Sequence, residues 1–160
     1  MNKNSLKNIA TEVINLEINA LKILKKSINK NFDKAVNTIV NCQSKIILCG
    51  VGKSGLIAAK IASTLSSVGS PAFSLSASDC LHGDLGSITK KDILILISNS
   101  GRSEEIIPII KFANRNKIKL IGIVSKKNSL LYKGSDIKIL LPDVKELSLI
   151  HISEPTRPRL

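Results

Sequence analysis

The sequence predicts an α/β protein: a three-layer α/β/α sandwich with a five-stranded parallel sheet, preceded by N-terminal helices. Two observations predict this class. Five short runs rich in Ile, Val and Leu recur along the chain, and stretches of helical periodicity separate several of them. Runs that are apolar at almost every position are typical of parallel strands buried on both faces, with connecting helices as the cover.

Two helices are expected ahead of the first strand. Apolar side chains recur at helical spacing over residues 5–27, and a second amphipathic stretch covers residues 32–40. Their apolar faces need a partner, which is either the domain or another subunit, so a homo-oligomer (dimer or tetramer) is one expectation. Residues 1–44 are assigned to this N-terminal helical segment.

Strands and helices then alternate. Strands are expected at 45–49, 72–75, 93–97, 120–124 and 137–141. Helices are expected at 54–68, 104–115 and 129–133. We assign residues 45–146 to the α/β domain. Ligands of open parallel sheets bind at the carboxyl ends of the strands, and the informative loops of this sequence fall there.

The last fourteen residues, 147–160, differ in character from the rest. The stretch "LSLIHISEPTRPRL" holds two of the five prolines and resembles the translated sequence of a transposase adapter used in DNA-library preparation. We expect a non-native tail, no function for His151, and a native chain that departs from this one after Glu146. A natural Pro-rich polar terminus is the alternative.

Composition narrows the function classes. A formal net charge of +12 suggests nucleic-acid binding, but the lysines are spread along the chain and aromatic residues make up 2% of it, too few to stack bases. No apolar run reaches the roughly 18–20 residues of a membrane span. Three cysteines without a C-x-x-C pattern favour a reducing compartment. A cytoplasmic protein that binds neither nucleic acid nor a membrane is expected.

A glycine-rich loop, "CGVGKSGL", follows the first predicted strand. A nucleotide P-loop does not fit, because Ile47 stands where its first glycine is required. A dinucleotide fingerprint is matched by Gly50, Gly52 and Gly55, but its acidic residue is expected at the end of the next strand, and Asp79 comes late. A lone G-x-G-x-x-G is a weak signal, so both alternatives are disfavoured.

A second loop of similar design, "SNSGRSEE", follows another buried strand and opens a helix. Free N–H groups and the helix dipole favour an anion there. Ser98, Ser100 and Ser103 add hydroxyl donors, and Gly101 allows close approach of the backbone. One serine would suffice for ordinary N-capping. Two such loops at neighbouring strand ends suit a small phosphorylated molecule.

The motifs "GVGKSG", "HGDLG" and "SNSG" followed by "SEE" resemble, in order and spacing, the sugar isomerase (SIS) domain of the D-arabinose-5-phosphate isomerase family. The resemblance covers residues 31–146. It implies a SIS-type, flavodoxin-like or Rossmann-like sandwich. It also implies interconversion of D-arabinose 5-phosphate and D-ribulose 5-phosphate through an enediol, towards the octulosonate sugar of lipopolysaccharide or capsule, without a cofactor.

The resemblance also implies roles for individual residues. The catalytic lysine falls on Lys53 and the two catalytic glutamates on Glu105 and Glu146. The substrate-binding residues would be Gly52, Ser54, His82, Ser98, Asn99, Ser100 and Ser103. A solvated loop lysine and a first-turn helix acid are the plain alternatives for Lys53 and Glu105. His82 is treated as lining the pocket; as a lone histidine it is a weak metal ligand, and no metal is expected.

Two departures from the family pattern matter. Arg102 stands where relatives usually carry an acidic residue, which could strengthen phosphate binding or alter sugar preference. The family's further catalytic histidine, in a later H-P-G segment, and the CBS modules that often follow are not found in these 160 residues. We therefore expect little or no turnover from this chain. Another SIS-domain sugar-phosphate isomerase and a non-catalytic regulatory module are the alternative functions.

Overall fold

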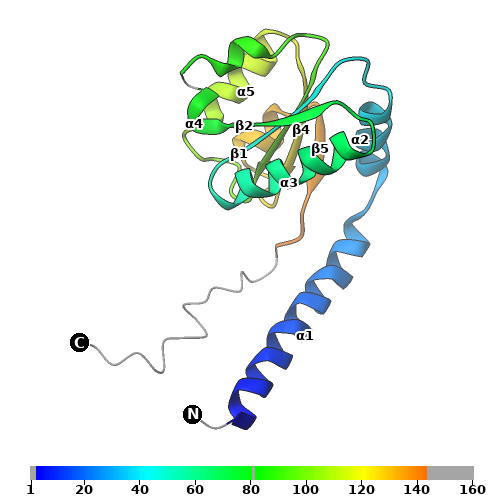
Figure 1. Ribbon diagram of the computed structural model, residues 1–160, viewed down its shortest axis with the longest axis vertical. Coiled ribbons are helices and arrows are strands. Elements are labelled where there is room, and N and C mark those ends of the chain that lie inside the picture. Colours follow the sequence, from blue (N-terminus) through cyan, green and yellow to red (C-terminus); the bar gives the residue numbers. More distant parts are fainter. Residues whose placement is uncertain (1–2, 81, 144–160) are drawn as a thin grey trace, which may run out of the picture. The chain divides into compact units, whose positions relative to one another are not determined.

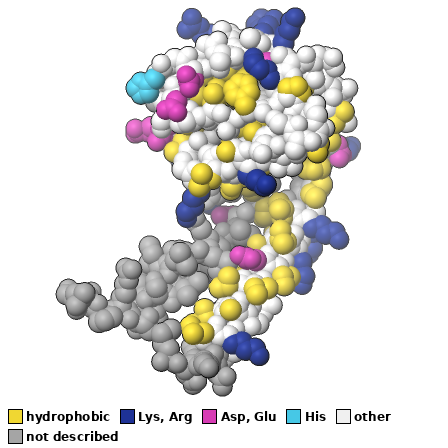
Figure 2. Space-filling model, viewed as in Figure 1, with side chains coloured by type: hydrophobic (Ala, Val, Ile, Leu, Met, Phe, Trp, Pro, Cys, Tyr) yellow, Lys and Arg dark blue, Asp and Glu magenta, His cyan; other side chains and the backbone are white. Residues whose placement is uncertain are grey.

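The computed structural model describes residues 3–80 and 82–143. They fall into two units, one of residues 3–26 with 142–143 and the other of residues 27–141. The first unit contains all but the last residue of the long helix α1 (Lys3–Ser27), along which Leu6, Ile14 and Leu21 are exposed. Figure 2 shows hydrophobic side chains along this helix. Within the described residues, no helix combines the length and apolar character needed to cross a membrane.

The second unit is built on a parallel sheet with the strand order β2-β1-β3-β4-β5 (Figure 1). Its strands are β1 (Ile46–Gly50), β2 (Ala72–Ser76), β3 (Ile93–Ser98), β4 (Lys119–Val124) and β5 (Ile137–Leu140). Strands β1 and β3 are fully buried along their length, as expected of central strands covered on both faces. The chain direction of the sheet places the loops after β1, β3 and β4 at one edge.

Helices cover both faces of the sheet, and each face has its own hydrophobic core. One core joins alternate strand residues such as Ile46, Leu48 and Ile95 to α2 (Lys30–Val40) and α3 (Lys53–Ser67). The other joins Ile47 and Leu96 to α4 (Ala77–Cys80), α5 (Ile106–Arg115) and α6 (Leu130–Gly134). The alternation follows from the two-residue period of a strand, which sends neighbouring side chains to opposite faces.

The amino ends of β1 and β3 are joined by a buried carboxylate, Asp92. It accepts hydrogen bonds from Ser44 Oγ at 2.6 Å, Lys45 Nζ at 2.9 Å and the backbone N–H of Thr89 at 2.6 Å. Burial alone would raise the pKa of the Asp92 carboxyl, but these hydrogen bonds outweigh it and hold the pKa well below its usual range. The ionised carboxylate therefore holds the amino ends of β1 and β3 together.

The predicted fold is confirmed, with each strand within one residue of its expected bounds. Two short elements were missed, α4 and the 3₁₀ turn η1 (Asp84–Ser87), because four residues are too few to show a period. The helix expected from residue 104 begins instead at Ile106. The N–H groups of Ile106 and Ile107 bond three residues back, to Ser103 and Glu104, so a turn precedes the helix.

Candidate functional site

The first loop of the candidate site leaves the carboxyl end of β1 and turns at once into α3. Gly52 has a φ of +56°, which favours glycine, and α3 begins at Lys53. A Cβ on Gly50 would lie 2.7 Å from the backbone of Ser54, so strand and helix can approach this closely only through glycine. Lys53 is exposed and Ser54 half-buried at this turn. The glycine-rich loop is therefore a tight turn between β1 and α3.

The second loop leaves the neighbouring strand β3 and is braced by its own serines. The Ser98 hydroxyl accepts a hydrogen bond from the Gly101 N–H at 3.0 Å, and the Ser100 hydroxyl accepts one from the Arg102 N–H at 3.3 Å. Both hydroxyls act as acceptors in these bonds, so their own hydrogens can still be donated to an anion. Gly101 has a φ of +63° where the chain reverses.

Both loops start from paired residues of the sheet. Gly50 pairs with Ile97 across β1 and β3, so residues 51–54 and 98–103 lie at the same edge. Ser76 pairs with Gly50 on the other side, and the segment that leads through α4 to the exposed His82 therefore starts at this edge as well. The expectation of two adjacent loops is confirmed. The roles of the individual residues stay predictions.

One of the two predicted glutamates lies beside the serine loop. Glu105 is half-buried and occupies the N-cap position of α5, where its side chain makes no capping hydrogen bond. It therefore follows the serine loop directly and remains a candidate acid or base. Glu146 lies outside the described residues.

A third loop, which the sequence analysis missed, completes this edge. The N–H of Ser125, directly after β4, donates to the carbonyl oxygen of Asn99 at 3.2 Å. Arg102 Nη2 donates to the carbonyl oxygen of Asn128 at 3.4 Å. The N–H of Leu131 donates to the carbonyl oxygen of Gly101 at 3.1 Å. Backbone and side-chain bonds thus join the loop after β3 to the loop after β4 and to α6.

Between these two loops lies a hollow of about 490 Å³. It is lined by Ser100, Arg102, Ser125, Lys126, Lys127 and Asn128. Three cationic side chains and two hydroxyls suit an anionic group, and the hollow adjoins the serine loop. The sequence signal was the pair Lys126-Lys127, one residue after a buried strand. Without the fold, this pair is indistinguishable from an ordinary solvated turn.

Two cysteines, at the end of α4 and near the end of β1, lie in the core. Cys49 and Cys80 are buried in the same core cluster. A hydrogen bond with Cys80, together with burial, raises the pKa of the Cys49 thiol well above that of a free thiol. Cys49 is therefore a protonated packing residue rather than a nucleophile. Among the described residues, no three His, Cys, Asp or Glu side chains gather as metal ligands.

Comparison with known proteins identifies the family. The family model of the SIS domain matches residues 39–154. The chain belongs to the SIS domain family.

The relatives place this chain on the arabinose-5-phosphate isomerase branch of the family. The chain is 40% identical over 149 residues to arabinose 5-phosphate isomerase KdsD of Francisella tularensis, covering 91% of this chain and 46% of that protein. It is 42% identical over 130 residues to KdsD of Yersinia pestis, covering 81% of this chain and 40% of that one.

A solved structure of the SIS fold agrees with these relatives. The protein c3406 of E. coli CFT073, solved in complex with arabinose 5-phosphate, superposes with a TM-score of 0.85 at 34% identity. The match covers 91% of this chain and 77% of that one. Against the curated KdsD relatives, by contrast, this SIS-family chain spans somewhat less than half the length of each.

Proposed function

We propose that this chain is part of an aldose–ketose isomerase that interconverts D-arabinose 5-phosphate and D-ribulose 5-phosphate. The observation that carries the proposal is the pair of anion-type loops that leave paired residues Gly50 and Ile97. The KdsD relatives support the choice of sugar. A cytoplasmic role in supplying an octulosonate sugar for lipopolysaccharide or capsule belongs to the same proposal.

The reaction moves one hydrogen between neighbouring carbon atoms. A base removes the proton from C2 of the aldose while the carbonyl oxygen at C1 gains a proton, which gives a 1,2-enediol. Return of a proton to C1, with loss of the proton from the hydroxyl at C2, gives the ketose. Substrate and product are isomers, so the step consumes no oxidant or reductant.

Three residues are proposed to carry the proton transfer. Lys53 would stabilise the negative charge that develops on the sugar oxygens. Glu105 or Glu146 would take the proton from C2, since a carboxylate can accept and return a proton. The phosphate of the substrate would lie at the serine loop, away from this carboxylate. His82, which follows α4 at the same edge, would contact the sugar.

The phosphate is proposed to lie at the second loop. Ser98, Ser100 and Ser103 would donate hydroxyl hydrogens, with Ser54, Gly52 and Asn99 contributing from the same two loops. The positive end of α5, a ten-residue helix, favours an anion at this position. Arg102, Lys126 and Lys127 add a cationic wall from the hollow beside it.

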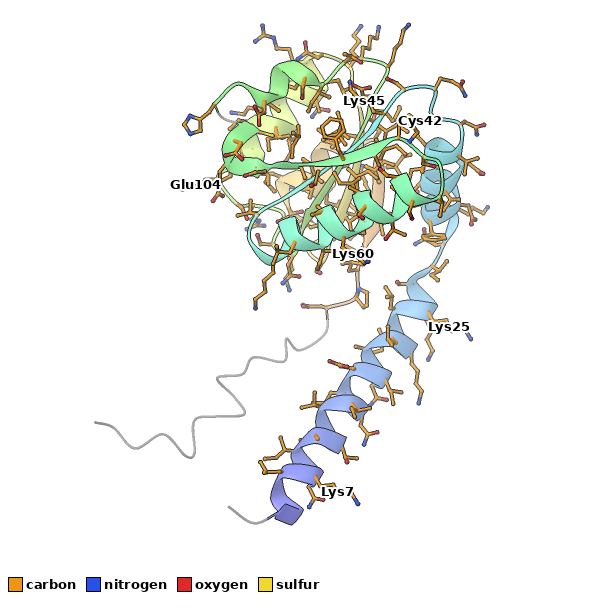
Figure 3. All side chains as sticks on the ribbon, viewed as in Figure 1. Lys7, Lys25, Cys42, Lys45, Lys60 and Glu104 are labelled. Carbon is orange, nitrogen blue, oxygen red and sulfur yellow. The ribbon has the colours of Figure 1, made fainter. Side chains whose placement is uncertain are left out.

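The proposal is tested first by binding and then by turnover. In calorimetry, arabinose 5-phosphate should bind and unphosphorylated arabinose should not. Incubation of the complete protein with the sugar phosphate in D₂O should place deuterium on the carbon that receives the proton, because the proton taken up by the base exchanges with solvent while the enediol is bound. Lys53→Met and Glu105→Gln should reduce this exchange, whereas Lys60→Met and Glu104→Gln, at the exposed positions labelled in Figure 3, should not.

Two results would redirect the proposal. Tighter binding of a hexose or heptose phosphate would indicate another SIS-domain sugar-phosphate isomerase. Binding without any deuterium exchange in the complete protein would indicate a regulatory binding module. We expect this chain alone to turn over slowly or not at all, and full turnover by it would contradict that expectation.

We also propose a homo-oligomer, dimer or tetramer. Apolar side chains are exposed on the outer faces of α2 and α3, among them Val40 at 73% and Leu56 at 74%. Association would bury this surface. Light scattering after size-exclusion chromatography measures the mass directly, and a monomer at every concentration would rule the proposal out.

A further inference from the structure

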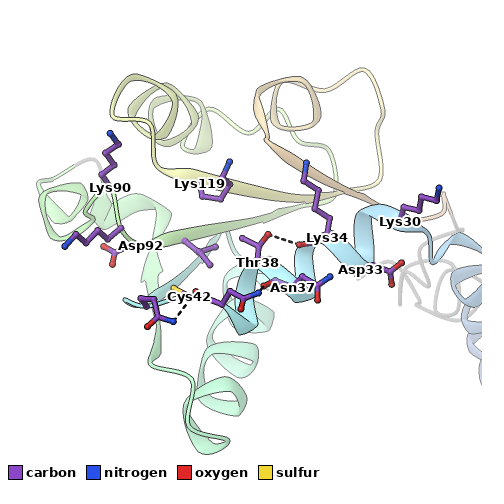
Figure 4. Close-up of a pocket in the computed structure, with 13 residues that line it drawn as sticks. Lys30, Asp33, Lys34, Asn37, Thr38, Cys42, Lys90, Asp92 and Lys119 are labelled. Carbon is purple, nitrogen blue, oxygen red and sulfur yellow. Dashed lines mark hydrogen bonds between the residues drawn. The ribbon is translucent and has the colours of Figure 1, made fainter.

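A second hollow lies at the other end of the sheet from the candidate site. It has a volume of about 900 Å³ and is formed by α2, by the turn before β3 and by the first residue of β4 (Figure 4). Ile93 and Lys119, which start β3 and β4, lie in its wall. The loops of the candidate site leave the opposite ends of these strands, so the two hollows are separate.

Lysine dominates the charge of this hollow. Its thirteen lining residues include five lysines and two aspartates, which leaves a formal charge of +3. The lysines are Lys30 and Lys34 from α2, Lys90 and Lys91 from the turn, and Lys119 from β4. They come from three separate segments of the chain, and Figure 4 shows Lys34 and Lys119 extending to the same side.

The two aspartates do not neutralise this charge. Asp92 is fully buried and bound by Lys45, a lysine outside the lining set. Asp33 is exposed on α2 and carries one charge against five. Lys119 reaches Asp136 at 3.5 Å, but both side chains are largely exposed, so this ion pair is weak and easily exchanged for a ligand.

The remaining lining residues narrow the class of ligand. Asn37, Thr38, Asn41 and Gln43 offer amide and hydroxyl groups, whereas no aromatic residue and no arginine lies among the thirteen. Without an aromatic ring there is no surface on which a nucleobase would stack, so a ligand is held by its charge. Lysines act as point charges and bind phosphate groups without a fixed geometry.

We infer that this hollow, lined by Lys30, Lys34, Lys90, Lys91 and Lys119, is a second anion site that binds a compact oligophosphate. A volume of about 900 Å³ lies in the range of small-molecule pockets, roughly 300–1,000 Å³. Because the lysines lie on three segments, two or three linked phosphates can contact more of them at once than a single phosphate can.

Inorganic tripolyphosphate is the probe that tests this inference. Calorimetry at constant ionic strength should give tighter binding than for inorganic phosphate, and backbone amide shifts should appear at residues 30–43 and 89–93. Lys34→Glu should raise the dissociation constant about fivefold or more, because it replaces an attraction with a repulsion. Lys90→Glu repeats the test from another segment in case the first variant folds poorly.

Lys60→Glu is the matched control, since it makes the same charge change on α3 outside the hollow. The inference is overturned if this control weakens binding as much as Lys34→Glu does, because overall charge would then explain the affinity. It is also overturned if amide shifts are confined to residues 98–105 and 125–128, or if a random DNA duplex binds more tightly than tripolyphosphate. Binding at residues 30–43 does not depend on the proposed isomerase activity.

Discussion

Arg102 Nη2 lies 3.4 Å from the carbonyl oxygen of Asn128, so a side chain of the loop after β3 is tied to the loop after β4. This bond orients the guanidinium along the wall of the hollow that adjoins the serine loop. An arginine that is already held in place loses little conformational freedom when it binds a phosphate. Arg102, which stands where relatives usually carry an acidic residue, is therefore expected to contribute to phosphate binding.

Arg102→Gln is predicted to weaken binding of arabinose 5-phosphate roughly tenfold, the usual effect of losing one charged hydrogen bond. Arg115→Gln, an exposed arginine at the end of α5, is the matched control and should leave affinity unchanged. Calorimetry measures both. Equal affinity of the Arg102 variant and the native chain would remove Arg102 from the site.

Gly101→Ala is predicted to lower the free energy of unfolding by about 2–4 kcal/mol. The residue has a φ of +63°, and a Cβ there would meet the side chains of Ser129 and Val124. Gly86→Ala is the control, because that glycine has open space around it and no positive φ. Urea unfolding compares the two. Similar stabilities of both variants would show that the loop can rearrange cheaply.

Asp92→Asn is predicted to lower the free energy of unfolding by about 2–4 kcal/mol at pH 7. The pKa of the Asp92 carboxyl is lower in the folded chain than in the unfolded chain. Its contribution is therefore complete above the unfolded-state pKa of about 4 and is lost as the pH falls towards the folded-state value. The variant should be less sensitive than the native chain to acid between pH 5 and pH 2.

Asp84→Asn serves as the control for this pH dependence, since Asp84 is exposed at the start of η1. Its unfolding curve should follow that of the native chain across the same pH range. Parallel acid sensitivity of the native chain and the Asp92 variant would contradict the assigned role of the carboxylate.

A thiol-reactive dye is predicted to modify one of the three cysteines quickly in the folded chain. Cys42 is half-buried, whereas Cys49 and Cys80 are buried and hydrogen-bonded to each other. Reaction requires the thiolate, which the raised pKa of Cys49 suppresses. The hydrogen bond with Cys49 lowers the pKa of Cys80, but burial of this thiol keeps the dye away from it. Cys42→Ser should abolish the fast phase. A fast phase that survives this substitution would mean that the core around β1 opens readily.

The centre of the sheet could be predicted because strands β1 and β3 carry a nearly unbroken apolar signal. Ile46 to Gly50 and Ile93 to Ser98 are buried at every position, and such runs have few alternative interpretations. The glycine and serine loops could be predicted for a similar reason, because a turn with a positive φ at Gly52 or Gly101 constrains the residue type.

The third loop could not be predicted, because its function depends on a contact across the sheet. Nothing local distinguishes Lys126 and Lys127 from solvated lysines; their position beside Ser100 follows from the pairing of β3 with β4. The hollow around Lys34 was missed for the same reason, since its lysines come from segments far apart in the sequence. Both sites are formed by residues that are far apart in the sequence and are brought together by the pairing of the strands.

The bonds from the Ser125 N–H to Asn99 and from the Leu131 N–H to Gly101 use main-chain atoms alone. These two bonds therefore remain whatever side chains face the hollow. Ser100 and Arg102 add bonds of their own to the loop, whereas Ser125 and Lys127 can be exchanged without loss of a bond described for this wall. For protein engineers, positions 125 and 127 form a compact library for changing the selectivity of the proposed sugar-phosphate site.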